Sequence, residues 1–252
     1  MRLRHTPASL PASKRRASTK PYQPRKPPSA MQHAALAAAG RSGYHVAARR
    51  QRRRLLMARA KAGGKASKVV ILLGSPRRNG NSAALAERIA AGARAAGARV
   101  QSFYLHGMKI APCRACESCR KPGAKGCVIR DDMQKAYPHL RAADAVVYAS
   151  PIYQFNVSAQ LKLAMDRCHA LGGEAGNALA GKRIGLAFSY GGEDPFDSGC
   201  TNAIRAFQDL FAYIGAPIVG MVYASAGAAG EVRSNRKAMR EAGELGRKLA
   251  GA

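Results

Sequence analysis

Residues 68–82 read KVVILLGSPRRNGNS, an apolar run that leads into a turn of small and polar residues. The apolar residues 69–73 are typical of a strand that is buried on both faces. A helical pattern opens directly after the turn, so the unpaired N–H groups at the helix start would point into it. The stretch therefore predicts the first strand of a parallel sheet, followed by an anion-binding loop.

Short apolar runs and helical patterns alternate over the rest of the chain, which is typical of a parallel sheet with helices on both faces. The expected strands are residues 69–73, 99–104, 145–149, 183–188 and 217–223. The expected helices are residues 82–96, 131–142, 158–170, 201–214 and 230–249. The fold class is α/β, a doubly wound five-stranded parallel sheet whose ligand lies beyond the carboxyl ends of the strands.

A basic tail, residues 1–66, precedes the folded domain, residues 67–252. The whole chain has a net charge of +28 with 42 Lys and Arg, and the tail holds 17 of these and no acidic residue. The domain keeps 25 basic against 14 acidic residues, a net charge of about +11. The tail composition predicts disorder. Three interpretations stay open: a nucleic-acid-binding arm, an organelle transit peptide, or a start codon placed too far upstream.

Apolar runs are short throughout the chain. None reaches the roughly 20 residues of a membrane-spanning helix, and the N-terminus lacks the apolar core of a secretory signal. We therefore expect a soluble cytoplasmic protein with no membrane partner. Six cysteines, four of them in residues 113–127, do not match a disulfide framework and predict reduced thiols, free or metal-bound. Cys168 is interpreted as helix packing, and Cys200 has no assignment.

The turn at residues 74–82 has the composition of a phosphate-binding loop. Ser75 and Ser82 supply hydroxyls and Asn81 supplies an amide. The turn lacks both the Gly-x-Gly-x-x-Gly spacing of a dinucleotide site and the Lys-Ser/Thr ending of an ATP-binding loop, so we expect a single terminal phosphate. The alternative is an ordinary turn in which Asn81 or Ser82 caps the helix.

The pattern Gly-Ser-Pro-Arg-x-x-Gly-Asn-Ser after a buried strand resembles the NADPH-dependent FMN reductase branch of the flavodoxin-like superfamily. The resemblance implies a flavodoxin-like fold in which this loop binds the phosphate of FMN. It assigns that role to Ser75, Arg77, Asn81 and Ser82. Members of the family usually form homodimers with the flavin near the interface, so the resemblance also implies at least a dimer.

The segment SPIYQFN, residues 150–156, is similar to the family's Ser-Pro-x-Tyr loop. A flavin ring needs a flat wall and backbone hydrogen-bonding groups, and such a loop offers both. The resemblance therefore assigns ring contacts to Pro151, Ile152, Tyr153 and Phe155, with Tyr153 as the leading one. The alternatives are that Pro151 only ends the strand and that Phe155 packs in the core.

The segment SYGGEDP, residues 189–195, follows the fourth expected strand. Paired glycines permit close approach of the backbone to a planar ligand, so Tyr190 and Gly191 are expected ring contacts. The likeness to the family is one of location here. Glu193 and Asp194 are expected to be solvated loop charges. Hydride transfer to a flavin needs no acid or base at a fixed position, so we expect no catalytic side chain.

Cys113, Cys116 and Cys119 stand at successive two-residue gaps, and Cys127 follows after seven further residues. Thiolates at this spacing can surround one face of an iron-sulfur cubane, with the fourth ligand arriving from a Gly-containing loop. The motif resembles that of iron-sulfur flavoproteins, in which a [4Fe-4S] cluster relays electrons between FMN and an outside carrier. Zinc and free thiols are the alternatives.

Together with these patterns, the family resemblance implies an FMN-dependent NAD(P)H oxidoreductase. Its acceptor would be a quinone, a nitro compound, a flavin or, through a cluster, a ferredoxin-like protein. The alternative is an iron-sulfur flavoprotein that carries electrons through a [4Fe-4S] cluster beside FMN without direct use of a nicotinamide. A pure flavodoxin-type carrier is disfavoured, because such carriers are typically acidic and this domain is basic. A nucleic-acid-binding role would depend on the tail.

Overall fold

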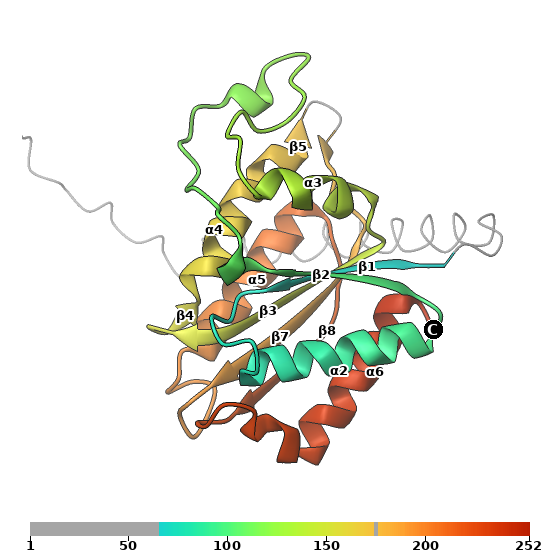
Figure 1. Ribbon diagram of the computed structural model, residues 1–252, viewed down its shortest axis with the longest axis vertical. Helices are drawn as coiled ribbons and strands as arrows, with labels where there is room; N and C mark the ends of the chain where they lie inside the picture. Colours follow the sequence, from blue (N-terminus) through green and yellow to red (C-terminus); the bar gives the residue numbers. More distant parts are fainter. Residues whose placement is uncertain (1–65, 174–175) are drawn as a thin grey trace, which may run out of the picture. The chain divides into compact units, whose positions relative to one another are not determined.

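A parallel sheet forms the centre of the computed structural model, which describes residues 66–173 and 176–252 (Figure 1). Its strands are β1 Lys68–Leu73, β2 Arg99–Tyr104, β3 Ala145–Tyr153, β7 Arg183–Tyr190 and β8 Ile218–Ser225, in the order β2-β1-β3-β7-β8. This is the flavodoxin-like order, and its direction reverses between β1 and β3. The predicted fold class is confirmed. The tail interpretations concern residues outside the described part, apart from Ala66.

Helices cover both faces of the sheet. One face carries α2 Asn81–Ala95 and α6 Arg236–Ala250; the other carries α3 Met133–Ala142, α4 Ala159–Arg167 and α5 Cys200–Ile214 (Figure 1). Alternate residues of β1 serve the two layers, because Val69 and Ile71 lie in the α2 and α6 core while Val70 and Leu72 lie in the other. None of the helices in the described part is both long and apolar enough to span a membrane.

Short elements complete the described part. They are the 3-10 helices η1 Leu105–Gly107, η2 Ser118–Arg120, η3 Cys168–Leu171 and η4 Glu231–Ser234, the strand β4 Asn156–Val157, and the strand pair β5 Gly172–Gly173 and β6 Gly176–Asn177. The expected helix 158–170 therefore ends as an α-helix at Arg167. The expected helix 230–249 is divided at Asn235, whose side chain accepts a hydrogen bond from Ala238 N at 3.0 Å and starts α6.

The third strand is longer than the sequence predicts. It runs through Pro151 to Tyr153 and turns back into β4, pairing Ile152 with Val157. The two turn residues, Gln154 and Phe155, have φ values of 47° and 61°. A two-residue hairpin turn of type I′ has positive φ at both central positions, which Asn and Gly favour. Gln and Phe do not favour positive φ, so the local sequence did not indicate the hairpin.

Candidate functional site

The turn after β1 lies at the edge of the sheet where the strand order reverses. The first intrahelical hydrogen bond of α2 runs from Ala84 N to Gly80 O at 2.9 Å, so the N–H groups of residues 81–83 precede it and remain for a ligand. Ser82 is 1% exposed, and its hydroxyl has no hydrogen-bond partner within the residues that the structure describes. These donors, gathered at a helix N-terminus, fit a phosphate group.

Ser75 shapes this turn from inside. Its Oγ accepts a hydrogen bond from Arg77 N at 3.0 Å and donates one to Arg77 O at 2.9 Å. Gly80 passes so close that a Cβ there would lie 2.8 Å from Ser75 Oγ, so the cradle leaves no room for a side chain. The Arg77 side chain is exposed beside the turn, where it can reach an anion.

Asn81 is already engaged by the protein. Its Nδ2 donates to Ala226 O at 3.2 Å and to Ala228 O at 2.9 Å, while its Oδ1 accepts from Val232 N at 3.1 Å. Both ends of the side-chain amide therefore hold the segment that follows β8, and its assignment to the phosphate stays a prediction. The backbone N–H of Asn81 remains for a phosphate.

Two buried serines connect the phosphate turn to the loop after β3. Ser158 Oγ donates to Gly74 O at 2.7 Å, and Ser158 N donates to Ser150 Oγ at 2.9 Å. Both serines are 0% exposed. A Cβ on Gly74 would lie 2.8 Å from Ser158 Oγ, so only glycine permits this approach. The two predicted loops therefore meet as one rigid unit at the switch point.

The β3–β4 hairpin presents aromatic rings to solvent. Tyr153 is 43% exposed and Phe155 is 61% exposed, while Pro151 is buried and Ile152 half-buried. The alternative that Phe155 packs in the core is wrong, and so is the alternative that Pro151 ends the strand. Holding Phe155 at positive φ costs free energy, and such strain is often retained where a side chain is presented to a ligand.

Tyr190 is less accessible to a flavin ring than Tyr153 and Phe155. It is 7% exposed and belongs to the apolar core, where burial raises the pKa of its hydroxyl. Contact with a ring is limited to its accessible edge, whereas Gly191 is exposed. Glu193 is exposed as expected. Asp194 has a structural role as well, because its Oδ1 accepts from Phe196 N at 2.6 Å.

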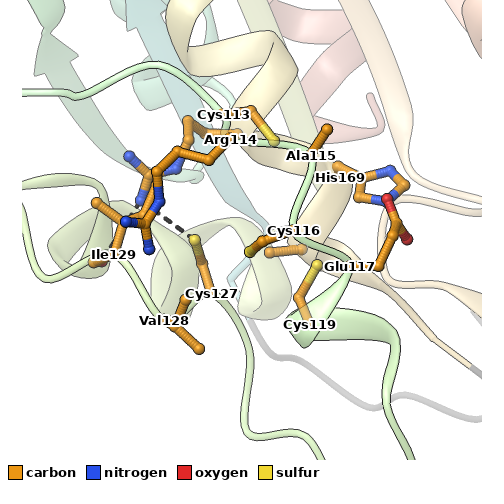
Figure 2. Close-up of a pocket in the computed structure, with 12 residues that line it drawn as sticks. Cys113, Arg114, Ala115, Cys116, Glu117, Cys119, Cys127, Val128, Ile129 and His169 are labelled. Atoms are coloured by element: carbon orange, nitrogen blue, oxygen red, sulfur yellow. Dashed lines mark hydrogen bonds and ion pairs between the residues drawn. The ribbon is translucent and has the colours of Figure 1, made fainter. Parts of the chain in front are cut away.

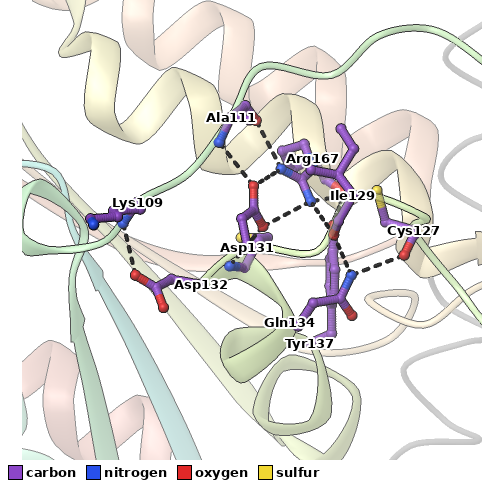
Figure 3. A network of polar contacts seen from close by, with 10 residues as sticks. Lys109, Ala111, Cys127, Ile129, Asp131, Asp132, Gln134, Tyr137 and Arg167 are labelled. Atoms are coloured by element: carbon purple, nitrogen blue, oxygen red, sulfur yellow. Dashed lines mark hydrogen bonds and ion pairs between the residues drawn. The ribbon is translucent and has the colours of Figure 1, made fainter.

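The cysteine segment joins β2 to α3 and is closed at its base by two carboxylates (Figure 3). Asp132 Oδ2 accepts from Lys109 N at 2.8 Å, and Asp131 Oδ2 accepts from Ala111 N at 2.9 Å. Asp132 N also donates to Lys109 O at 3.1 Å. Residues 109–132 therefore form a loop whose two ends are tied together, which we call the cysteine loop.

All four expected cysteine ligands line one pocket in the cysteine loop (Figure 2). The pocket is shallow and opens to solvent. Cys113 and Cys116 are exposed, while Cys119 and Cys127 are half-buried. A backbone hydrogen bond from Ser118 lowers the pKa of Cys116, and burial raises the pKa of Cys119. The close spacing of the four cysteines in the sequence thus predicted that they share one pocket.

The backbone around Cys116 is held in an unusual conformation. Ala115 and Glu117, on either side of it, have φ values of 48° and 52°, and neither is glycine. Left-handed residues next to right-handed ones turn successive N–H groups toward one concave side, as in many iron-sulfur sites. The strain is explained if these N–H groups face an anionic group in the pocket.

The thiols do not converge on a single point. Over residues 66–173 and 176–252, no three Cys, His, Asp or Glu side chains are gathered to hold one metal ion. A tetrahedral zinc ion requires its ligands to converge on one point. A four-iron cluster places each cysteine on a different iron and needs a wider cage. A pocket lined by four thiols fits the latter group better.

Two residues that pattern reading did not assign support the cysteine pocket (Figure 3). Gln134 Nε2 donates to Cys127 O at 2.9 Å and to Ile129 O at 2.7 Å. The Arg167 side chain is 0% exposed and bonds both oxygens of Asp131. Burial by itself lowers the pKa of Arg167, but the bond to Asp131 outweighs it and raises that pKa. The sequence could have indicated the role of Arg167 only by placing an arginine on the buried face of α4.

The two candidate sites lie at opposite ends of α4. Ser158, at its start, contacts the phosphate turn, and Arg167, at its end, contacts the cysteine pocket. A helix of these nine residues is about 14 Å long. The flavin loops and the thiols of one chain are therefore neighbouring regions and not one shared cavity.

The fold and the paired loops at the switch point define a flavodoxin-like domain, with the cysteine loop inserted between β2 and α3. Residues 67–231 match the model of the NADPH-dependent FMN reductase family. The chain belongs to that family.

Relatives and solved structures agree with this assignment. An iron-sulfur flavoprotein of Methanocaldococcus jannaschii is 39% identical over 115 residues, which cover 46% of this chain and 56% of the relative. One of Methanosarcina thermophila is 33% identical over 147 residues, covering 58% of this chain and 74% of the relative. The chain thus spans between about half and three quarters of the length of these relatives. An NAD(P)H:quinone oxidoreductase from Methanothermobacter marburgensis has the same fold, with a TM-score of 0.58 at 18% identity over 73% of this chain and 98% of that one.

Proposed function

We propose that the chain is an FMN-containing oxidoreductase that takes electrons from NAD(P)H and passes them to a quinone, nitro compound, flavin or protein acceptor. One observation carries the proposal: the bond from Ser158 Oγ to Gly74 O joins the phosphate turn to the aromatic hairpin at the switch point. Family membership supports FMN as the cofactor. A homodimer is part of the proposal, as the family resemblance implies.

The residues of the chain have separate tasks in this proposal. The N–H groups of residues 81–83 and the Ser82 hydroxyl would bind the phosphate, with Arg77 nearby as a cation. Tyr153 and Phe155 would provide a flat apolar wall and exclude water from one side of the ring. When bound, FMN would supply the hydride- and electron-accepting ring, so no side chain has to act as acid or base.

The second candidate function is an iron-sulfur flavoprotein electron carrier without direct nicotinamide use. It is favoured by the four thiols that line one pocket and by the names of the relatives. Cys113, Cys116, Cys119 and Cys127 would bind a [4Fe-4S] cluster, which would supply one-electron transfer. The acceptor or donor would then be a ferredoxin-like protein.

Anaerobic purification with an absorption spectrum and with iron, sulfide and zinc analysis tests both candidates. The first predicts a yellow protein that NADH or NADPH bleaches. The second predicts iron and sulfide in equal amounts, and a flavin that only a protein donor reduces. A protein that stays colourless in excess FMN would overturn both.

A cysteine variant provides the matched control. Changing Cys116 and Cys119 to Ser should remove iron and leave FMN bound, because the phosphate turn and hairpin contain neither residue. Unchanged iron content would exclude the cysteine pocket as the cluster site. Loss of FMN together with iron would contradict the separation of the two sites.

A further inference from the structure

Arg167 is a buried cation beside the cysteine pocket. Its residue exposure is 1%, and it stands first among the largest fully buried side chains of the described part. Nη1 donates to Ala111 O at 2.8 Å, and Nη2 donates to Cys127 Sγ at 3.4 Å and to Ile129 O at 3.5 Å. Its guanidinium therefore bonds both ends of the cysteine loop and one of the pocket thiols (Figure 3).

Stability alone does not account for this residue. The Arg167–Asp131 ion pair is buried, and desolvation of two charges often offsets most of their attraction. The guanidinium is also incompletely satisfied, because Nε has no hydrogen-bond partner among the described residues. A buried donor without a partner costs free energy, so a further acceptor is expected beside it.

The charge of the pocket supplies a reason for a cation there. Four cysteine thiolates would outweigh the positive charge of a bound cluster core and leave a net negative charge in the pocket. Arg114 also lines the pocket but is exposed, so solvent weakens its effect. Arg167 is shielded from water, and its charge acts at short range on Cys127.

We propose that Arg167 is a positioning residue of the cysteine pocket, which holds Cys127 in place and compensates negative charge on its sulfur. The inference rests on the proposed cluster. Reduction adds one electron, and so one negative charge, to the cluster and its thiolates, with no proton or bond change. A fixed N–H···S donor and cation favour the more negative state, so Arg167 raises the midpoint potential.

The test compares reconstituted holoproteins by redox titration followed with electron paramagnetic resonance, with dithionite as reductant. Arg167→Gln removes the charge, and Arg167→Lys keeps the charge without the planar guanidinium. Arg205→Gln removes one exposed charge, which pairs with Asp209. We expect Arg167→Gln to shift the midpoint potential to more negative values and to weaken iron retention against a chelator by roughly tenfold. Arg167→Lys should restore part of the potential, and Arg205→Gln should match the wild type.

Folding is checked by FMN content, since the flavin loops contain neither Arg167 nor Asp131. If Arg167→Gln does not fold, the double variant Asp131→Asn, Arg167→Gln removes the unpaired carboxylate as well. It is expected to show a smaller shift in the same direction, because the bond to Cys127 Sγ is lost while the net charge is unchanged. Wild-type potential and iron retention in every folded Arg167 variant would overturn the inference. If the wild-type protein binds no cluster, both the proposed cluster and the role of Arg167 are wrong. This outcome is distinguishable from a failure of the Arg167 inference alone, because it is seen in the wild type before any residue is changed.

Discussion

Ser82 lies in the first turn of α2, and its hydroxyl makes no hydrogen bond to the residues that the structure describes. Ser82→Ala should therefore leave the free energy of unfolding within about 0.5 kcal/mol of the wild type. The same change should weaken FMN binding by about tenfold or more, because a hydrogen bond to a charged group contributes about 1.5–3 kcal/mol. Fluorescence titration of the apoprotein with FMN measures the affinity.

Ser158→Ala is the matched control for that prediction. It removes the bond to Gly74 O and the bond accepted from Leu161 N, so it should destabilise the protein by about 1 kcal/mol or more. An FMN affinity in Ser82→Ala equal to that of the wild type would remove Ser82 from the phosphate site.

The cysteines differ in the ionisation of their thiols. Burial raises the pKa of Cys168 to about 12 and that of Cys200 to about 11, so both stay protonated at neutral pH. Because the thiolate is the nucleophile, iodoacetamide should modify exposed Cys113 and Cys116 first in metal-free protein. Cys168 and Cys200 should react only after unfolding. Peptide mass spectrometry over a time course measures this order, and early labelling of Cys168 would contradict it.

At the scale of elements, α2 and α6 approach each other through glycines. A Cβ on Gly246 would lie 2.1 Å from Ile89 O and 2.7 Å from Ala93 N, both backbone atoms that cannot move independently. Gly246→Ala should therefore destabilise the domain by about 1–3 kcal/mol or more through overpacking. Urea unfolding followed by circular dichroism measures the change.

Gly243→Ala is the control on the same helix. The three atoms nearest to a Cβ there all belong to the Arg88 side chain, with Nε at 3.2 Å, and the end of that flexible side chain can move aside. Alanine also has the better helix propensity, by about 0.5–1 kcal/mol. This variant should be as stable as the wild type or slightly more stable. Equal effects of the two substitutions would show that the close helix approach is not what limits stability.

At the scale of the whole molecule, charge is divided unevenly along the chain. Residues 1–66 carry 17 of the 42 basic residues, and residues 67–231 carry the family match. Removing residues 1–66 should therefore abolish any salt-sensitive retention of nucleic acid in a filter assay and leave FMN binding unchanged. Equal retention by the full and shortened chains would exclude the tail as a nucleic-acid arm.

The sequence by itself determined the flavodoxin-like sheet, the sites of its helices and the two loops at the switch point. The sequence also determined that four cysteines line one pocket. These features depend on local patterns: buried strands are apolar runs, helices repeat every 3.6 residues, and Cys113 to Cys119 are close in the chain. Strand order followed from family resemblance. The elements lie near their predicted positions, except that the third strand extends to Tyr153 and the expected helix 230–249 is divided at Asn235.

Only the tertiary structure decided which polar groups meet. Asn81 bonds a segment 145 and more residues away, and Arg167 pairs with Asp131 across 36 residues. Such pairs carry no periodic signal, because any buried polar group requires a partner but the chain does not state which one. The engagement of the Asn81 side chain by the segment after β8, and the place of Arg167 beside Cys127, therefore follow from packing and not from a sequence motif.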